Sequence, residues 1–152
     1  MKFVAQSVFV LLFISCNNSN TSTKNNSKTT ESESDSLMHE ILRQHDIGMA
    51  KMNKISDAKN RIQHSLDSIS KLPTDVQKRS VQYRMQLDST FNRLTFADYA
   101  MNKWMEEFSM DTLKDNKEEQ AKYLESEKSK IGKVNEAMVS SLQKADSLLM
   151  KK

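Results

Sequence analysis

The chain has 152 residues, enough for one domain, and 28% of them are charged while 37% are hydrophobic. With only two glycines and one proline it lacks the turn-forming residues that an all-β fold needs. Its composition also excludes a collagen, a disulfide-rich domain and a multi-span membrane protein. The formal net charge of +3 comes from 23 basic and 20 acidic residues of mixed order, so we expect no nucleic-acid partner.

The first residues have the pattern of an export signal. Lys2 precedes a short hydrophobic run at residues 3–14, which two polar residues interrupt. A helix of that length would span about 18 Å, too short for a hydrocarbon core of roughly 30 Å. We therefore expect residues 1–15 to be a signal peptide and not a transmembrane helix.

The signal ends in a sequence that resembles the lipobox of bacterial lipoproteins, Phe13-Ile14-Ser15-Cys16, with phenylalanine where leucine is usual. The resemblance implies cleavage after Ser15, a diacylglyceryl group on the Cys16 sulfur, and an acyl chain such as palmitate on the new amino terminus. Several acyl chains anchor a protein stably, whereas one binds only marginally. The alternative is an ordinary signal peptide with an incidental cysteine, but Cys16 is the only cysteine and stands at the cleavage point.

The anchor implies a place in the cell. We expect a lipid-anchored protein of the bacterial cell envelope, in the outer membrane and facing either the periplasm or the cell surface. Residues 17–36 carry no hydrophobic side chain, so they cannot bury enough surface to offset the entropy of ordering. We therefore expect residues 16–36 to be the lipidated cysteine followed by a disordered polar tether.

From residue 37 onward, hydrophobic residues recur at spacings of three and four, the period of one helix face. Pro73 interrupts the pattern once and a polar stretch at 110–116 interrupts it again. Short connections make successive helices antiparallel, so we predict an all-α fold, an elongated up-down-up three-helix bundle of residues 37–150. The predicted helices span about residues 37–71, 75–109 and 116–150.

The predicted core seam of this bundle is interrupted by polar residues. The first helix contributes Ile55 and Ile62 to the seam, and the second helix contributes Leu87 and Leu94. Thr74 and Gln77, just after the proline, match a capping box at the start of the second helix. The polar positions that fall on the seam are Lys59, Thr90, Lys128 and Asn135.

Three blocks of the sequence carry a family resemblance. They are His45-Asp46-x-x-Met49-x-Lys51-Met52-x-x-Ile55, then Met101-x-x-Trp104-Met105-x-x-Phe108, and Tyr123-x3-Glu127 onward to Ser141-x-x-Lys144-Ala145. Together they resemble a family of small Bacteroidetes lipoproteins that is labelled as containing a viral A-type inclusion protein repeat. The resemblance implies an envelope location and a helical fold, and it implies no reaction.

No motif in the sequence indicates an enzyme. With Gly48 and Gly132 as its only glycines, the chain has no phosphate-binding loop, dinucleotide fingerprint or nucleophile elbow. His39 and His45 are six residues apart, about 240° around a helix, so they cannot share a zinc ion as histidines four residues apart do. We therefore expect a non-catalytic protein without a cofactor.

Methionines and a histidine gather towards one end of the predicted bundle. Folding the first two helices about Pro73 places His45 opposite Met101. Thioether and imidazole ligands suit Cu(I), although methionine also fills irregular gaps in helical cores, where His45 would be a satisfied polar residue. Both interpretations stay open. The candidate ligands of the copper site are His45, Met49, Met52, Met101 and Met105.

A further pattern resembles the acceptor motif for O-glycosylation of exported Bacteroidetes proteins, namely Asp-Ser or Asp-Thr followed by a hydrophobic residue or threonine. Helix capping and heptad spacing explain the copies inside predicted helices. The remaining candidates are Ser36 in the predicted tether and Thr112 in the predicted loop.

Three function classes follow from these observations. The favoured one is a lipid-anchored envelope protein whose non-catalytic helical bundle makes protein–protein contacts, including self-association. The alternative is a periplasmic copper-binding or chaperone-like protein that uses the Met/His end. An enzyme is the class that the sequence supports least.

Overall fold

The computed structural model describes residues 27–150, which form helices joined by short connections and contain no strand. The prediction of an all-α fold is confirmed. The signal peptide at residues 1–15 and the anchor at Cys16 lie outside the described residues. Within residues 27–150, no helix has the length and hydropathy required to cross a bilayer. The helices are α1 (Ser27–Ser70), α2 (Thr74–Arg79), α3 (Val81–Glu107) and α4 (Lys117–Leu149).

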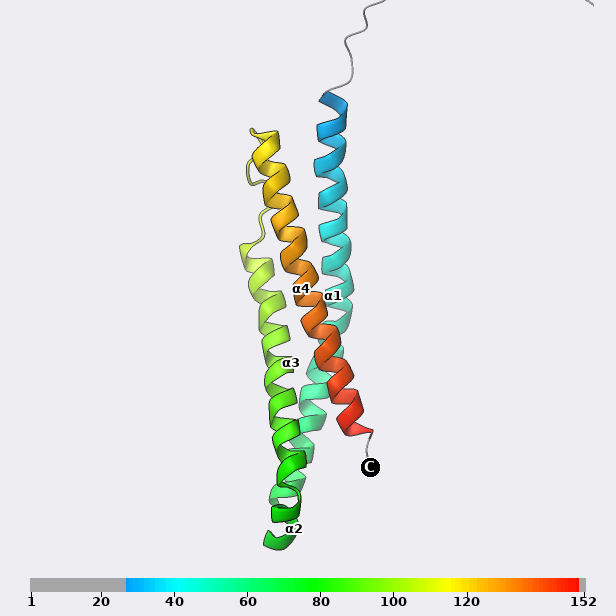
Figure 1. Ribbon diagram of the computed structural model, residues 1–152, viewed down its shortest axis with the longest axis vertical. Helices are drawn as coiled ribbons and strands as arrows, with labels where there is room; N and C mark the ends of the chain where they lie inside the picture. The colour runs from blue at the N-terminus through cyan, green and yellow to red at the C-terminus, as the bar shows by residue number, and fades with distance from the viewer. Residues whose placement is uncertain (1–26, 151–152) are drawn as a thin grey trace, which may run out of the picture.

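The three long helices lie side by side along one axis (Figure 1). In that view α1 descends from the top, the short α2 turns the chain at the bottom, α3 rises, and α4 descends again. α1 packs against both α3 and α4, and α3 packs against α4. Because α4 ends above the base of the molecule, the lowest part consists of α1 and α3 with α2 (Figure 1).

α1 begins at Ser27, ten residues before the predicted start at residue 37. The prediction of a disordered tether is therefore wrong for residues 27–36. That prediction relied on hydrophobic periodicity, and a polar segment gives no such signal. Once the following residues are helical, each added residue gains a hydrogen bond without a new nucleation cost. The helix can therefore extend into a segment that carries no hydrophobic side chain.

The turn after α1 differs from the predicted capping box of Thr74 and Gln77. Pro73 occupies the cap position of α2 with φ −54° and ψ 148°, and no side chain caps that end. Gln77 Nε2 instead donates hydrogen bonds to the backbone oxygens of Ser70 at 3.0 Å and Leu72 at 2.7 Å. These carbonyls belong to the end of α1, where helical partners run out. Gln77 therefore stabilises the preceding helix.

Ser80 divides the predicted second helix, 75–109, into α2 and α3. Its backbone has φ −92° and ψ 0°, and its hydroxyl donates a hydrogen bond to the Val76 carbonyl at 2.9 Å. A serine hydroxyl that bonds to a carbonyl four residues back bends and slightly weakens a helix. Hydrophobic periodicity does not register this effect, so the break was not predicted.

Residues 108–116 connect α3 to α4, as the polar stretch predicted. Leu113 adopts a left-handed backbone with φ 61°, which costs a residue with a Cβ on the order of 1 kcal/mol. Asn116 caps α4, because its side-chain oxygen accepts a hydrogen bond from the Glu119 backbone N–H at 3.2 Å. The chain therefore enters α4 through a strained but capped turn.

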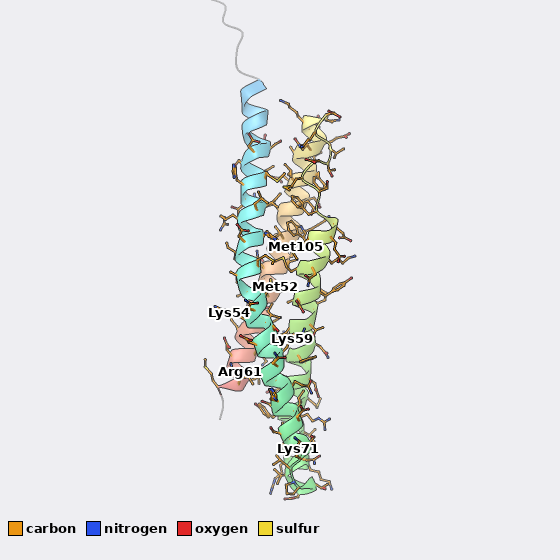
Figure 2. The ribbon with its side chains drawn as sticks, turned by 180° about the vertical axis from the view of Figure 1, so that it is seen from behind. Met52, Lys54, Lys59, Arg61, Lys71 and Met105 are labelled. Atoms are coloured by element: carbon orange, nitrogen blue, oxygen red, sulfur yellow. The ribbon has the colours of Figure 1, made fainter. Side chains whose placement is uncertain are left out.

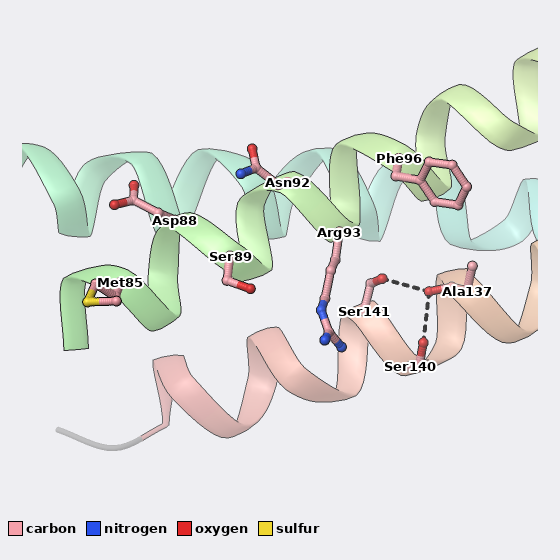
Figure 3. Close-up of a pocket in the computed structure, with 9 residues that line it drawn as sticks. All are labelled: Met85, Asp88, Ser89, Asn92, Arg93, Phe96, Ala137, Ser140 and Ser141. Carbon is pink, nitrogen blue, oxygen red and sulfur yellow. Dashed lines mark hydrogen bonds between the residues drawn. The ribbon is translucent and has the colours of Figure 1, made fainter. Parts of the chain in front are cut away.

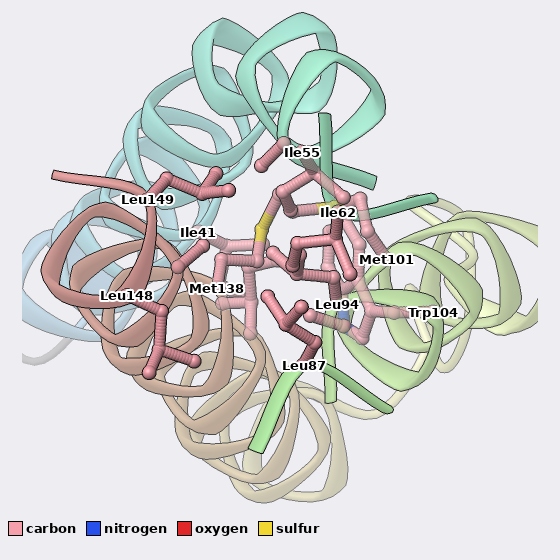
Figure 4. Packing of buried hydrophobic residues seen from close by; sticks show 14 of the residues in the cluster. Ile41, Ile55, Ile62, Leu87, Leu94, Met101, Trp104, Met138, Leu148 and Leu149 are labelled. Atoms are coloured by element: carbon pink, nitrogen blue, oxygen red, sulfur yellow. The ribbon is translucent and has the colours of Figure 1, made fainter. Parts of the chain in front are cut away.

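The core follows the seams that periodicity predicted (Figure 4). Side chains from α1, α3 and α4 meet in one continuous cluster along the long axis. This cluster is the main stabilising element, because a fully buried aliphatic side chain contributes about 1.5–3 kcal/mol. Its fully buried members include Ile55, Ile62, Leu87, Leu94, Ile131 and Met138.

Two of the predicted polar interruptions are satisfied within the protein. Lys59 Nζ donates to Asp98 Oδ2 at 3.1 Å, which joins α1 to α3 through a half-buried ion pair (Figure 2). The buried Thr90 hydroxyl donates to the Gln86 carbonyl at 2.8 Å. Both polar groups therefore enter the core with a partner, as buried polar groups require.

The prediction that Lys128 lies on the core seam is wrong, because its side chain is exposed. The seam of α4 steps from Leu124 to Glu127 and then to Ile131, so Glu127 is the buried residue. Steps of three and four residues are both allowed on a helix face, and neither residue is hydrophobic. Periodicity alone therefore could not choose between them.

The fourth interruption, Asn135, is buried where α4 meets α1. Its Nδ2 donates to the backbone oxygen of Gln44 at 2.8 Å and to Gln44 Oε1 at 2.9 Å. Its Oδ1 is buried and has no hydrogen-bond partner among the described residues. The close approach of α1 to these side chains depends on Gly48, since a Cβ there would clash with Met101 Cε and would lie 2.9 Å from Asn135 Oδ1.

Candidate functional site

Aromatic rings gather where α1, α3 and the first turns of α4 meet. Trp104 stacks on Phe108 with ring centroids 4.8 Å apart, and Phe108 is nearly parallel to Tyr123 at 6.4 Å. The imidazole of His45 lies 5.9 Å from the Trp104 ring. We call these four residues the aromatic cluster. Such ring pairs add about 0.5–1.5 kcal/mol each beyond their buried area, so the cluster fixes this end of the molecule.

A buried carboxylate holds the aromatic cluster in place. The Glu127 side chain is 4% exposed, and its Oε2 accepts a hydrogen bond from Trp104 Nε1 at 3.0 Å. Its Oε1 accepts a second from Lys130 Nζ at 2.7 Å. This hydrogen bond raises the pKa of the Lys130 ammonium above its ordinary value. Both carboxylate oxygens are thus satisfied, so we assign Glu127 a structural role.

A cavity of about 300 Å³ opens beside the cluster, lined by Leu42, His45, Trp104, Met105, Phe108 and Met110. His45 Nε2 lies 3.4 Å from Met105 Sδ, and His45 Nδ1 lies 3.1 Å from Asp46 Oδ1. The Met110 side chain is 57% exposed at the rim. One imidazole nitrogen and one thioether therefore face each other at an accessible opening.

The structure brings together two of the five predicted copper ligands, His45 and Met105. Met101 is fully buried and packs against Gly48, within the core. Met49 is 40% exposed and does not line the cavity, while Met52 is half-buried against the core. Figure 2 labels Met52, which lies on α1, and Met105, which lies on α3.

The pairing of His45 with Met101 was wrong by about one helical turn. It assumed a turn centred on Pro73. Because α2 also belongs to the turn, the centre lies later in the chain, and Met105 takes the position opposite His45.

Residues 27–150 hold no group of three or more His, Cys, Asp or Glu side chains placed to bind a metal ion. A metal at this end of the molecule would therefore depend on thioethers together with His45. Two thioethers and one imidazole form a soft ligand set, which suits Cu(I) better than Zn²⁺.

The two candidate glycosylation sites lie in different settings. Ser36 is exposed, but it lies within α1 and not in a disordered tether, so the reason for preferring it was wrong. Thr112 lies in the connection between α3 and α4, as predicted, and its side chain is partly buried.

The most exposed hydrophobic surface lies on α3, on the side away from the core. Four large side chains there are between 51% and 66% exposed: Val81, Met85, Phe96 and Tyr99. We call these four residues the α3 outer face. Beside it, α3 and α4 border a groove of about 660 Å³, whose α4 wall consists of the small residues Ala137, Ser140 and Ser141 (Figure 3). Hydrophobic periodicity did not identify this face, because it reports only the side of each helix that faces the core.

No protein-family model, curated protein or solved structure matches the chain.

Proposed function

We propose that this protein is a lipid-anchored, non-catalytic component of the bacterial cell envelope whose helices present a surface for protein–protein contacts. The observation that carries the proposal is the α3 outer face. Val81 lies one turn from Met85 on this face, and Phe96 lies one turn from Tyr99, and contiguous exposed hydrophobic side chains mark interaction sites. In this proposal α1, α3 and α4 act together as one up-down-up antiparallel three-helix bundle.

The anchor at Cys16 supplies the location in the proposal. The lipobox resemblance supports lipidation, and the blocks around His45 and Trp104 support membership of the family of small Bacteroidetes lipoproteins. The outer membrane is the proposed site. Anchoring confines the protein to a surface, which raises its effective concentration for partners on the same membrane.

Replacing Cys16 with serine tests the anchor. The variant should lose incorporation of a labelled fatty acid and should be recovered in soluble form or as uncleaved precursor, because the thioether cannot form. The matched control is Ser15→Ala, which keeps a small residue before the cysteine and should retain the label. Equal lipid labelling of Cys16→Ser and wild type would sink the proposed anchor.

A second candidate function is copper binding at the cavity beside the aromatic cluster. It is favoured by the 3.4 Å approach of His45 Nε2 to Met105 Sδ, with Met110 at the rim of the same cavity. These three side chains would supply one imidazole and two thioethers. Of the predicted set, this arrangement keeps His45 and Met105 as ligands.

Titration of the full-length protein with Cu(I) under reducing conditions tests this candidate. His45→Ala should weaken binding at least about tenfold, since even the loss of a residue behind a ligand costs 10–100-fold. His64→Ala is the control, because His64 is an exposed histidine farther along α1. Absence of uptake by wild type, or equal uptake by His45→Ala, would exclude the site.

A further inference from the structure

A groove of about 350 Å³ lies between α1 and α4, and its α1 wall is strongly basic. We call it the α1–α4 groove. Lys51, Lys54 and Arg61 line it on α1, whereas α4 contributes one carboxylate, Asp146, so the groove carries an excess of two positive charges. Figure 2 shows Lys54 and Arg61 on the side of α1 that lies next to the C-terminal end of α4, while Lys59 lies on the side of α3.

The three cations of the α1–α4 groove are not neutralised by the described part of the chain. Within residues 27–150, none of the three forms an ion pair with a carboxylate. Several exposed cations elsewhere on the helices have an acidic partner three or four residues away, as Arg43 has Glu40 and Lys122 has Glu118. The groove therefore offers its positive charge to a partner from outside the chain.

Two of these cations lie close together. The Lys51 side chain is half-buried, and its Nζ donates a hydrogen bond to the Ile47 backbone oxygen at 2.6 Å. Lys54 follows one helical turn later, about 4.5 Å along the axis. Burial lowers the pKa of the Lys51 ammonium below its ordinary value, and the positive charge of Lys54 lowers this pKa further. Holding both ammonium groups charged at this place costs free energy, which a bound anion would offset.

The rest of the groove lining is largely hydrophobic. Ala58 is buried, Leu142 is half-buried, and Val139 is 38% exposed. Walls of low dielectric constant strengthen the attraction between cations and an anion. A phosphate group has several strong acceptor oxygens, which match the three donors of each lysine ammonium group. The hydrophobic side chains would contact whatever apolar part the phosphate carries.

We propose that the α1–α4 groove binds a phosphate group, which Lys51 and Lys54 hold together. Arg61, about 10 Å farther along α1, adds to the positive potential that attracts the anion. Inorganic phosphate and the head group of an anionic phospholipid present the same chemistry to these side chains. This site goes beyond the proposed function, and it depends on neither the α3 outer face nor the anchor at Cys16.

Calorimetric titration of the full-length protein in neutral detergent micelles tests the site. The two probes are inorganic phosphate and a short-chain phosphatidic acid, each with a blank titration into micelles without protein. Lys54→Gln should weaken the binding of both probes at least about tenfold, because one charge-assisted hydrogen bond is lost. Lys54→Arg, which keeps the charge, should still bind. Added salt should weaken binding, because it screens the charges.

Two further variants separate the groove from the overall charge of the protein. Lys71→Gln removes the same charge just after α1, at an exposed position outside the groove, and should leave binding unchanged (Figure 2). Asp146→Asn should tighten binding, because it removes the carboxylate of the groove. Positions 54, 71 and 146 are all exposed, so circular dichroism should show unchanged helix content in each variant.

The two probes also identify the source of the phosphate. Phosphatidic acid that binds at least about tenfold more tightly than inorganic phosphate would support a lipid head group, whose chains use the hydrophobic lining. Similar affinities would support free phosphate in the same site. If neither probe binds at millimolar concentration, or if Lys54→Gln and Lys71→Gln weaken binding equally, the proposed site is overturned.

Discussion

Replacing Ile62 with aspartate is expected to lower the free energy of unfolding by about 4 kcal/mol or more. Ile62 is fully buried in the middle of the core, between α1 and its neighbours (Figure 4). The change removes about 1.5–3 kcal/mol of hydrophobic burial and adds the cost of a buried charge without a partner. Urea unfolding followed by circular dichroism measures the loss.

The control for this change is Asn60→Asp, which introduces the same side chain at an exposed position of the same helix. Its effect should stay within about 0.5 kcal/mol. If Ile62→Asp does not fold, Ile62→Ala should still fold with a loss of about 2–5 kcal/mol. Equal stability of the two aspartate variants would mean that the core seam has been misplaced.

The two glycines provide a second large effect, with opposite signs at the two positions. Gly48→Ala should destabilise the protein by up to about 2 kcal/mol, because overpacking costs about 1–3 kcal/mol and the better helix propensity of alanine recovers about 1 kcal/mol. The new Cβ would meet Met101 Cε and the buried Asn135 Oδ1. Neither neighbour can move freely, since Met101 is fully buried and Asn135 is hydrogen-bonded to Gln44.

Gly132→Ala is the matched control, since nothing lies within 4 Å of a Cβ at that position of α4. It should stabilise the protein by about 0.5–1 kcal/mol through helix propensity alone. Thermal unfolding of both variants should therefore show midpoints on opposite sides of the wild-type value. A stabilised Gly48→Ala variant would contradict the close approach of α1 to Met101.

Much of the core could be predicted from the sequence, because hydrophobic spacing reports which side of a helix is buried. Ile55, Leu87 and Leu94 were placed on the seam correctly for this reason. Glu127 was missed, since its burial depends on two partners, the Trp104 indole and the Lys130 ammonium, that no spacing rule identifies.

The candidate site was harder to predict than the core. Its residues come from separate helices, so their pairing depends on the register between α1 and α3. The turn includes α2 as well as Pro73, so its centre lies later in the chain and His45 lies opposite Met105 and not Met101.

The base of the molecule, below the end of α4, consists of α1 and α3 joined by α2 (Figure 1). Local opening costs less free energy where fewer buried side chains pack together. The turn between Ser70 and Ser80 is therefore the part of the described chain whose backbone amides exchange with solvent soonest, while the amides beside Ile62 and Ile131 wait for the core to open.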